Sequence, residues 1–269
     1  MKPFLKNILF AVTAITCTAI EASAEVTLPA FFTDNMVLQQ KATVPFWGKS
    51  NASSVKVTTS WDKKTYTVKT NGGDWQVSLK TPVYGGPYNI IINDGDEVQL
   101  KNILIGEVWL CSGQSNMEMP LEGWGKVLNY AEEIKNASYP QIRLLQAEHI
   151  ESAVPLDELK VQHGGWQVCS PQTIADFSST AYFFARKIYK EKNIPMGLVH
   201  SSWGGTVIEA WTSAEALHTI HDFDAVLDGM KDEESRKAQE QKFALDMQAW
   251  NQNMQKADMG MKDGKAIWA

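Results

Sequence analysis

The chain has 269 residues, a formal net charge of −6 and a hydrophobic share of 44% that includes 10 tryptophans. A mildly acidic chain lacks the basic patch that nucleic acid binding requires, and this hydrophobic share excludes a mainly disordered protein. We therefore expect a globular protein with room for two domains and no nucleic acid partner.

Residues 1–24 have the features of a secretory signal peptide. Lys2 and Lys6 precede an apolar stretch at residues 8–20, and Ala22-Ser23-Ala24 fits a cleavage site of small residues. The stretch is too short for a membrane span, and a retained anchor helix is the less favoured alternative. We expect an exported protein, periplasmic or extracellular, with no integral membrane segment after cleavage. The only cysteines after the signal, Cys111 and Cys169, permit one disulfide, and the sequence leaves open whether they meet.

Residues 25–101 predict a small antiparallel β-sandwich. Short β-type runs alternate with turn residues, and Asn and Gly adopt left-handed backbone angles at the least cost. The predicted strands are 54–61, 64–70, 75–79 and 88–92, with hairpin turns at 71–73 and 93–95. A packing platform and a carbohydrate-binding role both remain open, because Trp47, Trp61 and Trp75 are either core residues or rings that stack on sugars.

Residues 102–269 predict an α/β domain, because strands alternate with helices. The predicted strands are 103–111, 141–147 and 196–200, and the predicted helices are 127–137 and 178–192, the latter capped by Ser178 or Ser179. This order predicts a parallel sheet covered on both faces. Residues 214–261 predict one long amphipathic helix, a helical insertion over the sheet whose packing face carries Phe243, Met247, Trp250 and Met254.

Residues 113–117, Gly-Gln-Ser-Asn-Met, follow the predicted strand 103–111. Ser115 therefore lies at the carboxyl end of a strand, where open α/β sheets place their chemistry. A serine becomes a nucleophile when a base takes its proton and donors stabilise the oxyanion, and Gln114 and Asn116 supply amides beside it. Met117 in place of glycine excludes the Gly-x-Ser-x-Gly elbow of the α/β-hydrolases.

This motif, with Gly-Glu-Val-Trp at 106–109 and Glu-Met-Pro-Leu at 118–121, resembles the first signature block of the sialate O-acetylesterase family, a branch of the SGNH hydrolases. Residues 197–206, which include Gly204-Gly205, and Glu-Ala-Trp-Thr-Ser at 209–213 resemble the family's glycine block, and residues 32–39 are also similar. The resemblance implies a flavodoxin-like α/β/α fold of the SGNH type, removal of O-acetyl groups from a carbohydrate substrate by a serine esterase, and no cofactor or metal.

The resemblance also implies roles for single residues. Ser115 would attack the ester carbonyl, and its own N–H and that of Gly205, or with less support Gly204, would donate to the oxyanion. A tight turn is the alternative reading of the two glycines. Gln114 is a possible support of the site, and Asn116 is a support of the loop.

The family's later blocks, a Gly-Glu-Ser-Asn type motif and the Asp-x-x-His that supplies the orienting acid and the base, do not occur in the 269 residues. Only Glu215-x-x-His218 approaches the second block, His200 is the alternative base, and His218 with His221 lacks further metal ligands. We expect a C-terminally truncated member with an incomplete SGNH-type domain and absent or impaired activity. The alternative is a non-catalytic carbohydrate-binding or structural module.

Overall fold

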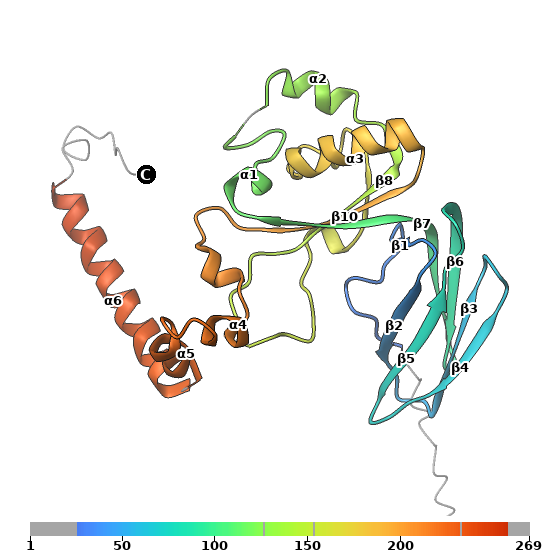
Figure 1. The fold of residues 1–269 in the computed structure, drawn as a ribbon, viewed down its shortest axis with the longest axis horizontal. Coiled ribbons are helices and arrows are strands. Elements are labelled where there is room, and N and C mark those ends of the chain that lie inside the picture. Colours follow the sequence, from blue (N-terminus) through green and yellow to red (C-terminus); the bar gives the residue numbers. More distant parts are fainter. Residues whose placement is uncertain (1–25, 126, 153, 232, 258–269) are drawn as a thin grey trace, which may run out of the picture.

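The computed structural model describes residues 26–125, 127–152, 154–231 and 233–257 of a mixed α/β chain (Figure 1). Strands dominate up to residue 113, and helices dominate after it. The predicted signal peptide at residues 1–24 lies outside the described part. In the part that the structure describes, no helix combines the length and the apolar character that crossing a membrane requires.

One large sheet and one strand pair contain the described strands. The large sheet has the order β4-β3-β6-β7-β10-β8-β9, with β1 also paired to β7, and β2 pairs with β5 separately. The pairs among β3, β4, β6 and the first half of β7 are antiparallel, whereas β1 and β10 are parallel to β7 and β8 is parallel to β10. The strands are β1 Val37–Gln39, β2 Thr43–Lys49, β3 Ser54–Thr59, β4 Thr65–Lys69, β5 Asp74–Lys80, β6 Gly85–Asn93, β7 Glu97–Gly113, β8 Tyr139–Gln146, β9 Gln167–Cys169 and β10 Met196–Ser202.

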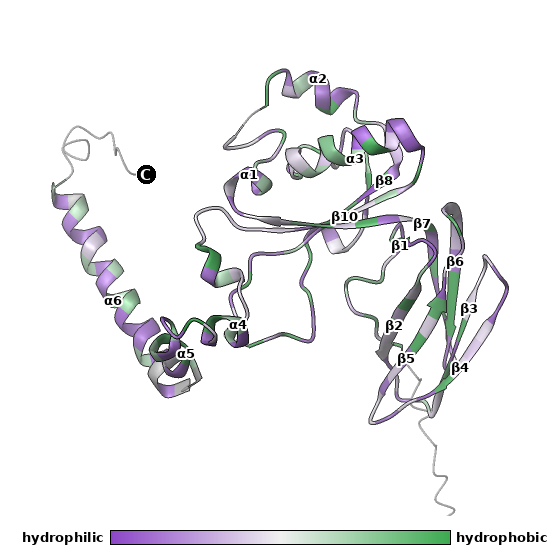
Figure 2. Cartoon of the chain, in the orientation of Figure 1, coloured by the Kyte–Doolittle hydropathy of each residue, from purple (hydrophilic) through white to green (hydrophobic). Residues whose placement is uncertain are grey.

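Two hydrophobic cores hold these elements together. The first joins β2 and β5 to β3, β6 and β7, and it buries Phe46, Val57 and Trp75 among others. The second lies between the parallel strands and the helix that follows β9, around Leu198 and Tyr182. Figure 2 shows this division as hydrophobic stretches on the strands of both parts. Trp75 is therefore a core residue, whereas Trp47 stays 38% exposed.

The described helices are α1 Ser115–Glu118, α2 Tyr130–Lys135, α3 Ser179–Lys192, α4 Ala214–His218, α5 Asp224–Lys231 and α6 Glu233–Ala257, with 3-10 turns at Gln162–Gly164 and Ile208–Trp211. Helices α1, α2 and α3 lie together on one side of the parallel strands (Figure 1). The sequence predicts a parallel sheet covered on both faces, and the described residues cover the second face differently from the α/β/α fold that the resemblance implies. Trp166 and Leu145 pack into the first core instead, so the β-rich part takes the place of a second helical layer.

Helix α3 confirms its sequence prediction closely. The Ser178 side chain caps the helix by accepting a hydrogen bond of 3.1 Å from the Ala181 N–H. Of the apolar face that the 3.6-residue period predicts, Ala181 and Ala185 are buried, whereas Phe184 is 38% exposed. Helix α2 is shorter than predicted, since it covers only Tyr130–Lys135 of residues 127–137.

The prediction of one long helix over residues 214–261 is wrong. The segment forms α4, α5 and α6, and a turn with His221 at φ 58° separates the first two. Helix α6 extends away from the sheet (Figure 1), and Phe243 and Trp250 on the predicted packing face are 67% and 52% exposed. Hydrophilic residues are frequent along α6 (Figure 2), and its apolar residues, although regularly spaced, have no surface of the sheet to pack on.

Strand β7 runs without a break through the expected domain boundary at residues 101–102. Its first part pairs with β6 across the turn at residues 93–97, and Glu107–Gly113 pair with β10. Ile103 and Ile105 lie beyond that boundary, yet both are fully buried in the first core. One strand therefore contributes to both cores.

The position of Ile103 and Ile105 predicts the stability of the isolated β-rich part. We expect residues 26–106 to unfold at a higher urea concentration than residues 26–102, because burying two isoleucines stabilises the longer fragment by about 3 to 6 kcal/mol. Urea titration followed by circular dichroism measures both fragments. Equal midpoints would contradict the stabilising role of Ile103 and Ile105, and a fragment 26–106 without folded structure would contradict independent folding of this part.

Candidate active site

The loops after β7 and β10 begin side by side at the carboxyl ends of the two strands. His200 is paired with Cys111 and Ser202 with Gly113 in the parallel register. Beyond the strands, the Trp203 N–H donates a hydrogen bond of 3.0 Å to the Gly113 carbonyl. The motif with Ser115 and the glycine pair therefore converge, as the order of strands predicts.

Ser115 is the first residue of α1, and a tight turn at Gly113 and Gln114 connects β7 to it. Gln114 occupies the N-cap position, where its carbonyl accepts hydrogen bonds from the Met117 and Glu118 N–H groups at 2.9 and 3.0 Å. Gly113 has φ 149°, a conformation that side chains rarely adopt, and a Cβ there would lie 3.3 Å from the Met117 Cβ. Gln114 and Asn116 are exposed, and neither side chain is hydrogen-bonded to a described residue.

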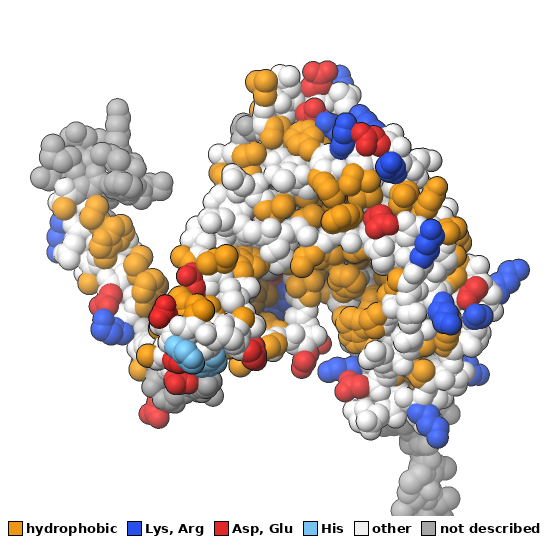
Figure 3. Space-filling model, viewed as in Figure 1, with side chains coloured by type: hydrophobic (Ala, Val, Ile, Leu, Met, Phe, Trp, Pro, Cys, Tyr) orange, Lys and Arg blue, Asp and Glu red, His pale blue; other side chains and the backbone are white. Residues whose placement is uncertain are grey.

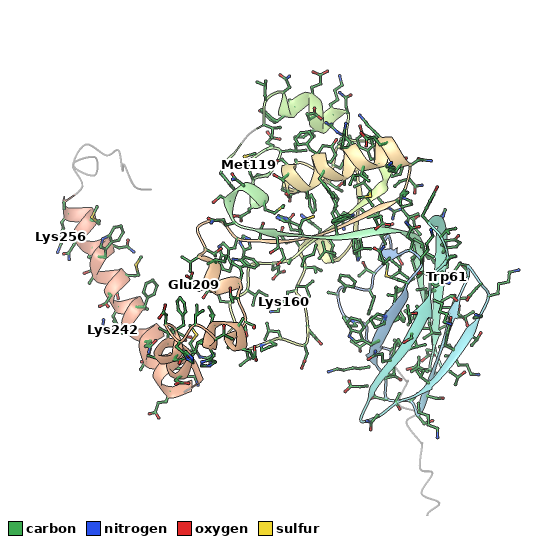
Figure 4. All side chains as sticks on the ribbon, viewed as in Figure 1. Trp61, Met119, Lys160, Glu209, Lys242 and Lys256 are labelled. Atoms are coloured by element: carbon green, nitrogen blue, oxygen red, sulfur yellow. The ribbon has the colours of Figure 1, made fainter. Side chains whose placement is uncertain are left out.

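The N-terminus of α3 fixes α1 from the other side. The hydroxyls of Ser178, Ser179 and Thr180 donate to the carbonyls of Met117, Met119 and Asn116, respectively. Figure 4 labels Met119 beside α1 and shows how closely it approaches the start of α3. These carbonyls have no intrahelical partner, because α1 is only one turn long. Ser115 therefore lies on a turn that three hydrogen bonds from the start of α3 hold in place.

Gly204 lies against the nucleophile candidate. A Cβ on Gly204 would lie 3.3 Å from the Ser115 Oγ and 2.6 Å from the Glu118 Oε2, so any side chain here would press on both. Gly205 has φ 81°, and a Cβ there would meet no atom within 4 Å. The Gly204 N–H donates to the Glu118 carboxylate, whereas no hydrogen bond among the described residues uses the Gly205 N–H.

Glu118, which the sequence motifs did not single out as a site residue, joins three segments. Its Oε2 accepts the Gly204 N–H, and its Oε1 lies 3.1 Å from the His149 Nε2. Glu118 follows Ser115 by three residues, which places both on the same face of a helical turn. That spacing was the available signal, and it was used only as part of the family motif.

His149 was missed because it lies on the loop after β8, far from both motifs in the sequence. Its Nε2 lies 2.9 Å from the Ser202 carbonyl as well as close to Glu118. Both neighbours accept hydrogen bonds, so Nε2 carries the proton and Nδ1 is the nitrogen left to accept one. The ring stacks on Trp203 with centroids 4.5 Å apart and an interplanar angle of 11°.

All five histidines lie in described residues, and none is hydrogen-bonded to Ser115. His200 is buried, and its Nε2 contacts the Ser202 Oγ at 2.5 Å. His163 pairs with Asp176, and His218 and His221 both pair with Asp224. His218 is therefore paired with Asp224 and not with Glu215, as a Glu215-x-x-His218 dyad would require. No group of three or more metal-ligating side chains forms within the described ranges.

The burial of His200 makes stability depend on pH. Desolvation lowers the pKa of His200 from 6.5 to about 4, because the charged imidazolium would lose its water. The unfolded chain therefore binds the proton more readily than the folded chain between these values. The contribution of His200 to the free energy of unfolding is fully present above pH 6.5. It falls by up to about 3 kcal/mol as the pH falls toward 4.

Urea unfolding at a series of pH values tests this effect. We expect His200→Gln, which removes the titrating group and keeps a polar side chain, to flatten the pH dependence between 6.5 and 4 relative to the parent. Parallel curves for the two proteins would contradict the assignment.

Cys111 and Cys169 are both free thiols in the second core. Burial raises the pKa of Cys111 to about 11 and that of Cys169 to about 12. Both stay protonated at neutral pH, so neither thiol competes with Ser115 as a nucleophile.

Comparisons with known proteins agree with this geometry. The family model described as carbohydrate esterase, sialic acid-specific acetylesterase, matches residues 105–258, which is more than half of the chain. The sialate O-acetylesterase of Homo sapiens is 31% identical over 206 residues, or 70% of this chain and 39% of the human protein, and that of Mus musculus is 30% identical over 207 residues.

A crystal structure of a carbohydrate acetylesterase from Xanthomonas citri is 35% identical, with a TM-score of 0.67 over 72% of this chain and 44% of that chain. The chain thus spans about two fifths of the length of these relatives. The mixed α/β fold agrees with that of the Xanthomonas protein. On the matched residues 105–258, which contain both converging loops, the chain belongs to the carbohydrate esterase family of sialic acid-specific acetylesterases.

Proposed function

We propose that this protein is a serine esterase that removes O-acetyl groups from carbohydrates, with Ser115 as the nucleophile. The observation that carries the proposal is the convergence of Ser115 and Gly204-Gly205 at the ends of two neighbouring parallel strands. Family membership and the names of the matching relatives support the reaction and an acetylated carbohydrate as substrate. Those relatives are esterases by name, which disfavours a non-catalytic module.

In the proposed reaction, the Ser115 Oγ attacks the acetyl carbonyl, and the sugar leaves from the tetrahedral intermediate. Water then releases acetate from the acetylated Ser115. The family's later blocks, which supply the base and the orienting acid, do not occur in these 269 residues. Their absence accounts for a nucleophile that has no hydrogen bond to a histidine among the described residues.

We propose the Gly205 N–H and the Ser115 N–H as oxyanion donors. The Gly204 N–H is bound to Glu118, whereas the Gly205 N–H is free of partners among the described residues. The first N–H groups of a helix have no intrahelical acceptor, which supports the Ser115 N–H as the second donor. Gln114 would support the site and Asn116 the loop, the latter through its carbonyl bond to Thr180.

The finer architecture also remains a proposal. Residues 25–101 would form a β-sandwich domain, and residues 102–269 would form part of an SGNH-type domain with a helical insertion near residues 214–261. We also propose that the signal peptide at residues 1–24 directs export to the periplasm or beyond. The two separate cores support the division, whereas the unbroken β7 means that the two parts share a strand.

Acetate release tests the function. A protein extended to include the later family blocks should deacetylate O-acetylated xylose or sialic acid, and Ser115→Ala should lower turnover by about 10⁶-fold. Retained activity in Ser115→Ala would refute Ser115 as the nucleophile. An extended parent protein that releases no acetate from any acetylated sugar would refute the function itself.

A further inference from the structure

A second candidate site lies far from Ser115, between the β-rich part and the loop after β8. A cavity of about 530 Å³ is lined by residues of β2 and β5 on one wall and by Asp157 and Glu158 on the other. The loop that carries these carboxylates is closed at its base by a hydrogen bond of 3.0 Å from the Glu148 N–H to the carbonyl of Lys160, which Figure 4 labels. Figure 3 shows the surface hollowed between the strand-rich part and the rest of the molecule.

The aromatic side of this cavity is held in place. Trp47 lines the cavity and is 38% exposed, although tryptophan is usually covered when it has a core to join. Its ring packs edge-on against Phe32, with centroids 4.7 Å apart and an interplanar angle of 81°. Trp75, which also lines the cavity, is 3% exposed and forms part of the wall. A preorganised, half-exposed indole offers an apolar face at little entropic cost.

The polar side of the cavity has many groups able to hydrogen-bond. Asn71 and Gln76 line it together with five charged side chains, none of which forms an ion pair with another described residue: Lys49, Lys69, Asp74, Asp157 and Glu158. Carboxylates and amides accept hydrogen bonds from hydroxyl pairs, and lysines donate to ring and hydroxyl oxygens. Two cations and three anions leave little net charge, so the cavity favours a neutral ligand that is rich in hydroxyls and has an apolar face.

We propose that this cavity binds a neutral oligosaccharide through stacking of a sugar ring on Trp47. The volume falls within the range of small-molecule sites, and the position between two parts of a chain is where such sites commonly form. None of the residues of the Ser115 site lines this cavity, so it is a separate binding site. The choice of a carbohydrate ligand rests on the proposed function, and the site would hold a polymeric substrate at a second point of the same protein.

Calorimetric titration of the 269-residue chain carrying Ser115→Ala tests the site without turnover. Xylohexaose, cellohexaose and mannohexaose serve as probes. We expect at least one of them to bind with a dissociation constant on the order of 1 mM, and Trp47→Ala to weaken binding by about tenfold or more. Trp250→Ala is the matched control, because Trp250 is exposed on α6 and lies outside the cavity.

A second variant protects the test against a folding defect in Trp47→Ala. Asp157→Ala removes an exposed carboxylate from the opposite wall and should also weaken binding, with an unchanged circular dichroism spectrum. No binding by any probe up to about 10 mM, or binding unaffected by both cavity variants, would overturn the proposal. Binding without esterase activity in the extended protein would refute only the proposed function, whereas activity without binding here would refute only this site.

Discussion

The 269-residue chain and its Ser115→Ala variant are expected to hydrolyse p-nitrophenyl acetate at the same background rate. A serine hydroxyl is a weak nucleophile without a base, and loss of the catalytic histidine costs a serine hydrolase about 10⁶-fold in turnover. Here no histidine is hydrogen-bonded to Ser115 among the described residues, and His200, the alternative base, is hydrogen-bonded to Ser202 inside the core. Spectrophotometric release of p-nitrophenol measures both rates.

A Ser115-dependent rate near that of ordinary esterases would contradict this expectation. It would indicate a base within these residues, and His149 and His200 would then be the candidates at this edge of the sheet. Alanine substitution at each histidine would separate them. His163→Ala is the control, because His163 is paired with Asp176 and is not bonded to either site loop.

Substitution of Glu118 by leucine should lower the turnover number of the extended esterase by roughly 100-fold and leave KM nearly unchanged. Leucine has a similar size but cannot accept the Gly204 N–H, so the glycine loop loses its bond to the turn that carries Ser115. A displaced Gly205 donor would weaken the transition state without affecting substrate binding. Glu118→Gln should retain activity within about tenfold, because its amide oxygen can still accept that N–H.

Steady-state kinetics of the parent, Glu118→Leu and Glu118→Gln separate the effects on kcat and KM. Glu122→Leu is the matched control, since Glu122 is exposed on the same loop and its side chain forms no hydrogen bond with a described residue. Equal turnover in the parent and in Glu118→Leu would show that the carboxylate does not position the loop. A loss in Glu118→Leu that Glu118→Gln fails to restore would assign the effect to the lost contact between the carboxylate and His149 instead.

Local patterns in the sequence predicted the elements that stand on strong local signals. Helix α3 has a capping serine, a regular apolar face and lysines in its last turn, and it forms where expected. Strand β10 is an apolar run bounded by Pro195 and the glycine pair, and it too lies where predicted. The hairpin between β6 and β7 follows from Asn93 and Gly95.

The errors arose where tertiary contacts decide the outcome. Sequence period cannot show which face of a sheet another part of the chain will cover, so Trp166 and Leu145 were not assigned to the first core. The apolar residues of α6 have a helical spacing, but spacing alone does not supply a surface to pack on. The expected domain boundary at residues 101–102 falls inside β7 for a related reason. The strand changes its pairing partner from β6 to β10 without a break in its backbone.

The same limit explains what was missed in the site. Ser115 and the glycine pair belong to contiguous motifs, and their convergence follows from strand order. Glu118 and His149 are about 30 positions apart in sequence. They meet only because β7 and β8 end at the same edge of the sheet. Residues that are joined by the fold and not by a motif leave no signal in a single sequence.

The most direct test of the central claim is covalent labelling of the nucleophile. A serine-reactive phosphonate, applied to the extended protein and followed by peptide mass spectrometry, should label Ser115, and Ser115→Ala should abolish labelling. Ser201 and Ser202 are the last two residues of the neighbouring strand β10 and provide internal controls, and Ser202 is buried beside His200. Labelling of Ser201 or Ser202 with Ser115 unmodified would contradict Ser115 as the nucleophile of this esterase.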